Sequence, residues 1–223
     1  MTTAGTEFVV AFLKNHRFSN QPMLHMITPS ELDVEVHIET PTWNSQESLH
    51  LTRSLNSSNN LEVKLPVDLR VQTSIVDNKV VLVTSTKPIF LFASDMQLNT
   101  GDYFIIYPLK TLGREYIVSG FKSTEVNLDW KSVMGCIAVN ADTTVNITVP
   151  TGQTLDYNGS IYQQGSTISV FLQMYQIVQV YGFDVTGSFI ISDKPIAVFS
   201  GHELHINSYQ GIVRRTYRKF YRA

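Results

Sequence analysis

Apolar and polar residues alternate along much of this chain with the period of a β-strand. Positions 32–39 alternate strictly: Leu32, Val34, Val36 and Ile38 occupy one phase, and acidic residues or histidine occupy the other. Successive side chains of a strand point to opposite faces, so this pattern predicts one buried and one solvated face. Segments 142–151 and 176–181 alternate in the same way, and 7–13 is a nearly continuous apolar run of strand length. Because no segment keeps a helical period beyond a turn or two, the pattern predicts an all-β protein.

Two segments carry the same Ser-x-Lys-Pro-Ile sequence between apolar runs rich in strand formers, at Ser85–Ile89 and at Ser192–Ile196. Turn-forming residues between two apolar runs predict a tight hairpin at each place. Asn158-Gly159 predicts a further hairpin, because this dipeptide suits the two-residue turns that join antiparallel strands.

Three sequence features recur at nearly one spacing. Gly5 corresponds to Gly113 (113 − 5 = 108), Pro41 to Pro150 (150 − 41 = 109) and Lys87 to Lys194 (194 − 87 = 107). Recurrence in the same order predicts a duplicated unit. We therefore expect two tandem, related antiparallel β-sandwich modules packed together, at residues 1–100 and 101–208, followed by a basic tail at 209–223.

Composition and charge narrow the possible partners. The chain has 223 residues, 43% of them hydrophobic, with a net charge of −2 and a pI near 6.3. This balance supplies no overall field for nucleic acid. The tail at 213–222 mixes basic and aromatic residues, but we interpret it as a solvated chain end and predict no nucleic-acid partner. No apolar run is long enough for a membrane-spanning helix, so no membrane insertion is expected.

The first seven residues have neither the basic start nor the apolar centre of a signal peptide. By itself this leaves two alternatives open: a cytosolic protein, or a fragment whose export signal lies outside this sequence.

No catalytic, cofactor or metal site is predicted. Cys136 lies in an apolar run and is expected to be a buried, inert thiol. His202 and His205 form the densest group of possible ligands, but a zinc site needs at least three donors. Side chains three apart on a strand point to opposite faces, so we expect solvated histidines after a hairpin. The sequence has no Gly-x-Ser-x-Gly and no phosphate-binding loop.

Several ordered segments together resemble the amino-terminal domain of the IgGFc-binding protein family. They are Gly5–Phe12, Val83–Ile89, Leu112–Val118, Asn140–Ile147 and Asp184–His202, and the resemblance extends over residues 5 to 205. It implies an extracellular, non-enzymatic module, which in larger relatives precedes cysteine-rich von Willebrand type D repeats of mucus-associated or adhesive proteins. The chain departs from that pattern after His202, where no cysteine follows.

Three Asn-x-Ser/Thr sequences are possible N-glycosylation sites if the chain enters a secretory lumen: Asn56, Asn146 and Asn158. The preferred hypothesis is an extracellular module that binds a protein or glycan ligand, either immunoglobulin-like or mucin-like. The alternatives are a structural β module of a multimeric assembly and a metal-dependent hydrolase.

Overall fold

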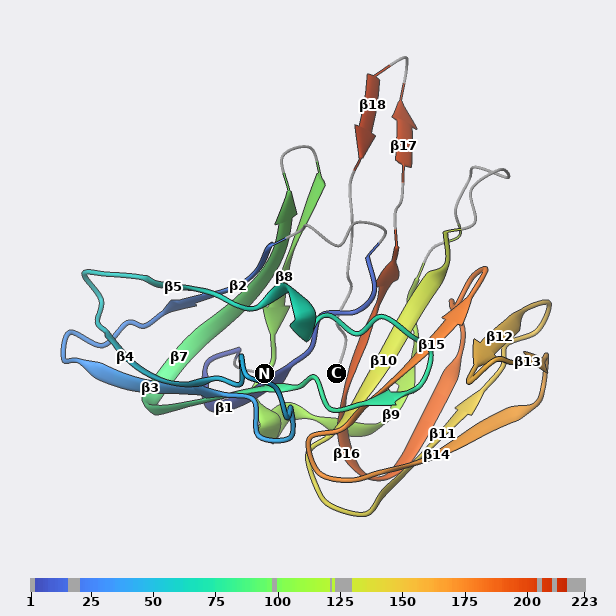
Figure 1. The fold of residues 1–223 in the computed structure, drawn as a ribbon, viewed down its shortest axis with the longest axis horizontal. Helices are drawn as coiled ribbons and strands as arrows, with labels where there is room; N and C mark the ends of the chain where they lie inside the picture. The colour runs from blue at the N-terminus through green and yellow to red at the C-terminus, as the bar shows by residue number, and fades with distance from the viewer. Residues whose placement is uncertain are drawn as a thin grey trace.

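The computed structural model describes residues 3–15, 21–97, 100–120, 122, 130–203, 206–209 and 212–215. These residues form two antiparallel sheets that lie side by side, plus a separate two-stranded hairpin (Figure 1). Helical turns among them are limited to η1 (Val67–Leu69) and η2 (Leu109–Thr111). The predicted all-β fold of two packed modules is confirmed.

One long strand organises the first module. The strands are β1 (Gly5–Val10), β2 (Gln21–Ile27), β3 (Val34–Glu39), β4 (His50–Leu55), β5 (Leu61–Lys64), β7 (Val81–Gln97) and β8 (Thr100–Ile106). The beginning of β7 pairs with β1 and β3, and its end pairs with β2 and β8. The sheet therefore folds over into two layers joined by β7, with the apolar core between them.

The second module repeats this plan around β16. Its strands are β9 (Gly113–Ile117), β10 (Ser132–Ala138), β11 (Thr143–Thr148), β12 (Thr154–Tyr157), β13 (Ser160–Gln163), β14 (Thr167–Leu172), β15 (Ile177–Gly182) and β16 (Phe189–His202). A short strand from the first half, β6 (Val76–Asp77), joins its edge at β15. The hairpin of β17 (Ile206–Tyr209) and β18 (Ile212–Arg215) pairs apart from both sheets.

Strand registers agree between the modules at the spacings found in the sequence. Gly5 pairs with Ile89 as Gly113 pairs with Ile196, and Phe8 pairs with Val83 as Tyr116 pairs with Ile190. The pairs that β3 makes with β7 recur between β11 and β16. The two modules are therefore related position by position, not only in overall shape.

The predicted Lys-Pro hairpins are wrong. Both β7 and β16 continue without interruption through the Ser-x-Lys-Pro sequence, as single strands of 17 and 14 residues. Proline has no N–H to donate to a neighbouring strand, and pairing of β16 with β9 skips from Ile191 to Ile196. Within the gap, the Ser192 hydroxyl donates to the Lys194 carbonyl oxygen at 2.7 Å. The Ser-x-Lys-Pro sequence therefore forms a bend within one strand, and the strand belongs to one layer of its module before the bend and to the other layer after it.

Some predicted boundaries also differ from the structure. Leu32 lies before β3 and is 70% exposed, so it does not join the buried face of Val34, Val36 and Ile38. The Asn158-Gly159 hairpin is confirmed, with φ of 51° and 74° in the turn between β12 and β13. The division at residues 100 and 101 falls within β8, which pairs in the first sheet, and as a domain boundary it stays a prediction.

The second module packs on the first through its strands β10 and β15, which are buried on both faces. Along β10, Met134, Cys136 and Ala138 enter the second core, whereas Val133 and Ile137 join the first core. Gly135 lies between them, and a Cβ there would stand 2.6 Å from Leu13 Cδ2. A glycine is needed at this point because the first module approaches so closely. The predicted burial of Cys136 is confirmed, and burial raises the pKa of its thiol to about 12.

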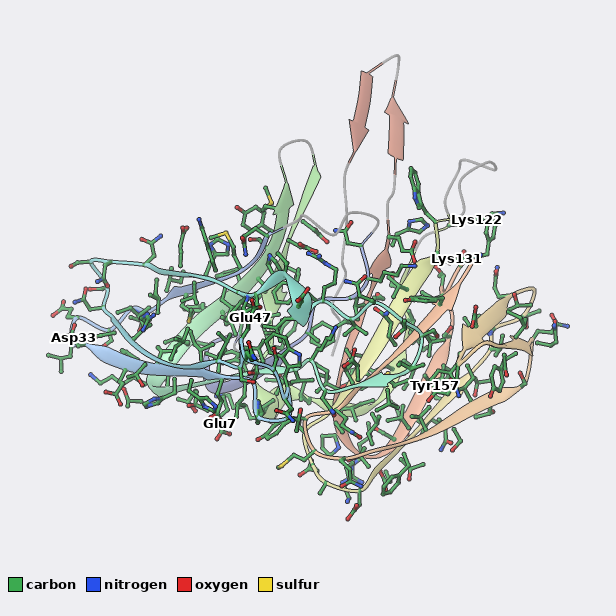
Figure 2. All side chains as sticks on the ribbon, in the orientation of Figure 1. Glu7, Asp33, Glu47, Lys122, Lys131 and Tyr157 are labelled. Carbon is green, nitrogen blue, oxygen red and sulfur yellow. The ribbon has the colours of Figure 1, made fainter. Side chains whose placement is uncertain are left out.

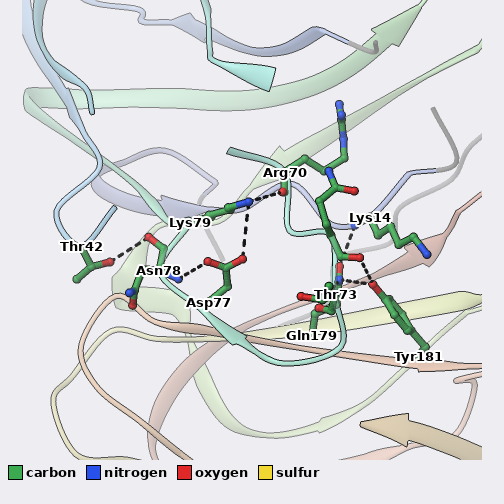
Figure 3. Close-up of polar contacts among 10 residues, drawn as sticks. Lys14, Thr42, Arg70, Thr73, Asp77, Asn78, Lys79, Gln179 and Tyr181 are labelled. Carbon is green, nitrogen blue, oxygen red and sulfur yellow. Dashed lines mark hydrogen bonds and ion pairs between the residues drawn. The ribbon is translucent and has the colours of Figure 1, made fainter. Parts of the chain in front are cut away.

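Buried polar groups also hold this junction together (Figure 3). The Gln179 side chain accepts a hydrogen bond from the Lys14 backbone N–H at 2.8 Å and donates to the Thr73 carbonyl at 3.0 Å. Its amide also donates to the Tyr181 hydroxyl, which in turn donates to the Gln72 carbonyl. Nearby, Arg70 and Asp95 form a fully buried ion pair at 2.6 Å. The segment between β5 and β7 is thereby fixed against the second module.

Candidate protein-binding face

One layer of the second module carries exposed large apolar side chains on its outer surface. Strands β9, β16, β11 and β14 lie next to one another, and their side chains alternate between the core and the outside. Tyr116, Ile190 and Ile147 point into the second core. Their neighbours form what we call the outer face: Glu115, Ile117, Thr144, Asn146, Thr148, Thr167, Ser169, Phe171, Phe189 and Ile191.

Register brings the apolar members of the outer face together. Phe189 lies opposite Ile117, and Ile191 follows two residues later on the same side of β16. Hydroxyl and amide side chains of β11 border them, because Thr148 is opposite Phe189 and Asn146 is opposite Ile191. The face is therefore an apolar strip bordered by neutral polar side chains of β11 and by the exposed carboxylate of Glu115, which lies opposite Ile191 on β9, a composition that suits contact with a protein.

The same positions in the first module are covered. Val9 corresponds to Ile117 and Leu82 to Phe189, yet Val9 is 2% exposed and Leu82 is 8% exposed. Ile117 and Phe189 are 73% and 36% exposed. Side chains from the linker and the second module, namely Leu109, Leu112, Val139 and Tyr175, pack against the core cluster that contains Val9 and Leu82. The two modules therefore have apolar residues at matching places, but the pair in the first module is buried and the pair in the second is exposed.

Electrostatics agree that Tyr175 of the second module reaches the outer surface of the first. Burial raises the pKa of its hydroxyl, and the nearby carboxylates of Glu7 and Glu39 raise it further. Glu7 lies on β1 at the outer side of the first module (Figure 2). The Tyr175 carbonyl also accepts a hydrogen bond from Thr42 at 2.9 Å. The junction thus closes over part of the first module's outer surface.

Charge distinguishes the two surfaces as well. On the first module, Glu35, His37 and Glu39 alternate along β3, and His37 Nε2 lies 3.0 Å from the Glu35 carboxylate. The corresponding strand of the second module, β11, carries Thr144, Asn146 and Thr148 instead. A partner of the second module therefore has fewer charges to desolvate along β11 than along β3, although the carboxylate of Glu115 on β9 is exposed beside the strip.

Exposure of the strip has an energetic consequence. Fully burying one large aliphatic or aromatic side chain is worth about 1.5–3 kcal/mol. Covering Ile117, Phe189 and Ile191 with a complementary surface would recover part of this for each residue. Exposed apolar patches of this kind mark interaction sites in soluble proteins.

The three predicted glycosylation positions lie in different surroundings. Asn158 is exposed at the tip of the β12–β13 hairpin. The Asn56 side-chain amide donates to Asp33 at 2.8 Å. Asn146 is half-buried within the outer face, between Ile191 and Ser169 on the neighbouring strands. Glycosylation at each of the three stays a prediction, and a glycan on Asn146 would occupy the outer face itself.

The histidine prediction needs correction. His202 is not solvated after a hairpin: it ends β16, pairs with Ser132 of β10 and is 3% exposed. His205 and most of the basic tail lie outside the described residues. Within the described part of the chain, no cluster of three or more His, Cys, Asp or Glu side chains is placed to hold a metal ion. A search of the same part for helices long and apolar enough to cross a membrane also finds none.

Comparison with known proteins places the chain in a family. The model of the IgGFc binding protein family matches residues 102–213, which is half of the chain and includes the second module. This chain belongs to the IgGFc-binding protein family. It is 24% identical over 204 residues to the human IgGFc-binding protein. That alignment covers 90% of the chain and only 4% of the human protein. Among solved structures, an anti-sigma factor domain-containing protein aligns over 94% of this chain and 81% of its own, at 11% identity and a TM-score of 0.20, too low to support any argument.

Sequence reasoning did not locate the outer face. One signal was present, because Phe189, Ile190 and Ile191 form an uninterrupted apolar run. Such a run places apolar side chains on both faces of a strand, whereas 32–39 alternates. The sequence could not show which of the two faces is covered, since the covering residues come from other strands.

Proposed function

We propose that this member of the IgGFc-binding family is an extracellular, non-enzymatic protein-binding module, and that the outer face of its second module is the contact surface. One observation supports the proposal most directly. Apolar residues at Ile117 and Phe189 are exposed, although their counterparts Val9 and Leu82 are covered. A surface that is covered in one module and open in its relative is suited to a partner.

The partner we propose is an immunoglobulin-like protein rather than a glycan. The human relative is named for binding the Fc part of IgG, and that name supplies the first ligand to test. The apolar strip of Ile117, Phe189 and Ile191 favours a protein, because hydrophobic cores and polar rims are the usual anatomy of protein interfaces. Mucins and isolated glycans are the competing ligands.

Surface plasmon resonance on immobilised human IgG Fc tests this proposal, with a mucin surface and a glycan array alongside. We expect saturable binding to Fc and a loss of about tenfold or more for Phe189→Asp, because an interface centre does not tolerate an unpaired charge. Tyr103→Asp is the matched control. Tyr103 is 61% exposed and lies on β8, a strand of the first sheet that does not belong to the outer face.

Binding equally weakened by Phe189→Asp and Tyr103→Asp would contradict the assignment of the surface. Binding to the glycan array alone would contradict the proposed class of partner. Circular dichroism of both variants must match the wild type for the comparison to hold.

A second candidate function is assembly, favoured by the edge of the same layer. Within the part of the chain that the structure describes, β14 (Thr167–Leu172) pairs with β11 alone; it carries no charge and exposes Phe171 at 57%. Uncharged edge strands can pair with another chain. Static light scattering distinguishes the two functions: a monomer at all concentrations, unchanged by Ser169→Lys, would remove this candidate.

A further inference from the structure

One layer of the first module carries a set of large apolar side chains on the side away from its core. The layer consists of β5, β2, the end of β7 and β8. Leu24 of β2 and Leu91 of β7 belong to the first core cluster, so the alternate residues of these strands point outward. Register places the outward residues beside one another, and we call this set the aromatic face: Met23, His25, Ile27, Phe90, Phe92, Ser94, Met96, Tyr103 and Ile105.

Solvent reaches most of the aromatic face. Tyr103 is 61% exposed and Ile27 is 45% exposed. The other large apolar members are each partly exposed: Met23, Phe90, Phe92, Met96 and Ile105. Single exposed apolar residues are normal on a protein surface, whereas a contiguous group of this kind marks an interaction site.

The corresponding layer of the second module is already an interface. Ile27 of β2 lies opposite Phe90 of β7. The equivalent pair of the second module is Ile137 of β10 and Ala197 of β16, at the spacing of 107 residues that relates the two Lys-Pro sequences (194 − 87 = 107). Ile137 and Ala197 belong to the first core cluster, because the second module packs on the first at this place. The same layer is therefore covered by a neighbouring module in one half of the chain and faces solvent in the other.

Side-chain size differs between the two layers. In the second module, Gly135 is small enough to admit Leu13, and its pairing partner on β16 is Phe199. In the first module, the equivalent of Gly135 is His25, which lies opposite Phe92. The aromatic face therefore projects rings where the covered layer has a hollow. Projecting side chains suit packing against another sheet, in which the side chains of the two faces interdigitate.

Polar groups of the aromatic face are paired with one another. His25 Nε2 and Ser94 Oγ are hydrogen-bonded at 2.8 Å, and His25 Nδ1 lies 3.3 Å from Glu62 Oε1 at the β5 edge. The ring of His25 also contacts the ring of Tyr103, with centroids 5.5 Å apart. Covering the face does not separate these groups, because each finds its partner within the face. Burial of the face therefore leaves them hydrogen-bonded.

Charge is balanced along the edge of the face. Glu62 and Lys64 lie on the same side of β5, opposite His25 and Met23, and their charges sum to zero. Contact between two identical surfaces must not bring like charges together, because such contacts are unfavourable. The outer face of the second module carries the Glu115 carboxylate, whereas the aromatic face has no net charge among its described side chains. The aromatic face can therefore meet its own copy without net repulsion.

We propose that the aromatic face binds a second copy of this chain, with the same four-stranded layer of each copy packed face to face about a two-fold axis. A second copy is the occupant because the face is neutral and its polar groups are paired internally. The equivalent layer also already packs on a module of the same chain. This inference goes beyond the proposed function, since it uses a surface of the first module and leaves the outer face out of the contact.

The size of the aromatic face sets the strength of the dimer. Four strands about 4.8 Å apart, with the seven residues of β2 rising about 3.3 Å each, span roughly 20 by 23 Å. This flat area of roughly 450 Å² is smaller than the about 800 Å² per partner of a stable interface. We therefore expect a reversible dimer with a micromolar dissociation constant.

Sedimentation velocity of the full chain, from low micromolar to millimolar concentration, tests this inference. We expect an equilibrium between monomer and dimer that saturates at the dimer. Tyr103→Asp and Ile27→Asp should each raise the dissociation constant by about tenfold or more, because an interface centre does not tolerate an unpaired charge. Phe189→Asp is the matched control, since it places the same charge at an exposed apolar residue of the other module, and it should dimerise as the wild type does.

A mixture of two variants tests the two-fold arrangement. Tyr103→Asp and Tyr103→Lys should each dimerise poorly alone, because like charges then meet across the contact. Their mixture should recover dimers, since a copy with a negative face meets one with a positive face. Urea unfolding midpoints of all variants should match the wild type, because Tyr103 and Ile27 lie outside the core.

Each other outcome of these measurements overturns the inference. A monomer at every concentration, or equal weakening by Tyr103→Asp and Phe189→Asp, shows that the aromatic face binds no second copy. Growth beyond the dimer, or no recovery in the mixture, shows that the face meets a different surface. Association that only Ser169→Lys abolishes assigns the contact to the β14 edge.

Failure of this inference and failure of the proposed function are distinguishable. Fc binding is measured below the dissociation constant of the dimer, where wild type and Tyr103→Asp are both monomers. Loss of Fc binding with the dimer retained removes the proposed function alone. Absence of the dimer, with Fc binding weakened by Phe189→Asp, removes this inference alone. Fc binding that is abolished by Tyr103→Asp and not by Phe189→Asp makes Fc the occupant of the aromatic face and overturns both.

Discussion

The junction between the two modules should depend on one buried amide side chain. Gln179 is fully buried and makes three hydrogen bonds, to the Lys14 N–H, the Thr73 carbonyl and the Tyr181 hydroxyl. Gln179→Ala removes all three and leaves the backbone partners in an apolar setting. At about 1 kcal/mol of net stabilisation per hydrogen bond, the change should cost about 3 kcal/mol of unfolding free energy.

Urea unfolding followed by tryptophan fluorescence measures this cost, because Trp43 packs on the first core and Trp130 lies two residues before the start of β10. Gln176→Ala is the matched control. Its side chain lies in the same region and donates to Asn78 of the first half at 3.0 Å, but at an exposed site. Surface hydrogen bonds exchange readily with water, so this control should cost less than about 1 kcal/mol.

A cost for Gln179→Ala no greater than that for Gln176→Ala would refute the reasoning. It would mean that water enters the junction and replaces the lost bonds. A biphasic transition in Gln179→Ala but not in the wild type would add support, because it would show the two modules unfolding separately.

Three further predictions concern single side chains of the second module. Tyr116→Phe should lower the free energy of unfolding in urea by about 2 kcal/mol, because its hydroxyl accepts from the Gly113 N–H and donates to the Ile196 carbonyl; no change would show that these bonds contribute nothing. Burial raises the Cys136 pKa from 9.0 to about 12, so the folded state favours the neutral thiol. That contribution is full below pH 9 and is lost as pH rises toward 12, at up to about 1.4 kcal/mol per pH unit; Cys136→Ala should flatten this part of the stability curve, and native protein should not react with a thiol reagent at pH 8. In a glycosylating host, mass mapping should find a glycan on exposed Asn158, and any fraction that carries one on Asn146 should bind Fc more weakly than Asn146→Gln.

Local patterns predicted much of the β architecture because they depend on neighbouring residues alone. Alternation placed Val34, Val36 and Ile38 in the core, and all three are fully buried. Asn158-Gly159 marked its hairpin, because both residues adopt positive φ readily. These features arise within a few residues and need no information about distant segments.

The Lys-Pro segments show where local reasoning failed. A turn and a bend can use the same residues: proline is frequent in tight turns, and in both of these bends the serine hydroxyl donates to the lysine carbonyl oxygen two residues further on. Whether the strands on either side pair with each other or with different neighbours is decided elsewhere in the chain. Here β16 pairs with β9 and β11 before the bend and with β10 after it, so one strand serves both layers.

The candidate site was predicted least well, and the reason is physical. Val9 and Ile117 are both apolar residues of a strand, and nothing around them in the sequence distinguishes their exposure. Val9 is buried within a core packed by Leu109 and Tyr175, which lie about a hundred or more residues along the chain. No local rule reaches that far.

The sequence by itself determined the all-β class, the related modules and the residues that face each core, because strand periodicity and recurring spacings are written along the chain. Tertiary structure alone decided that Lys-Pro bends rather than reverses the strand, that Gly135 admits Leu13, and that Ile117 and Phe189 are exposed whereas Val9 and Leu82 are buried. The burial of a residue depends on which segments, distant in the sequence, pack against it, and each of these outcomes depends on such packing.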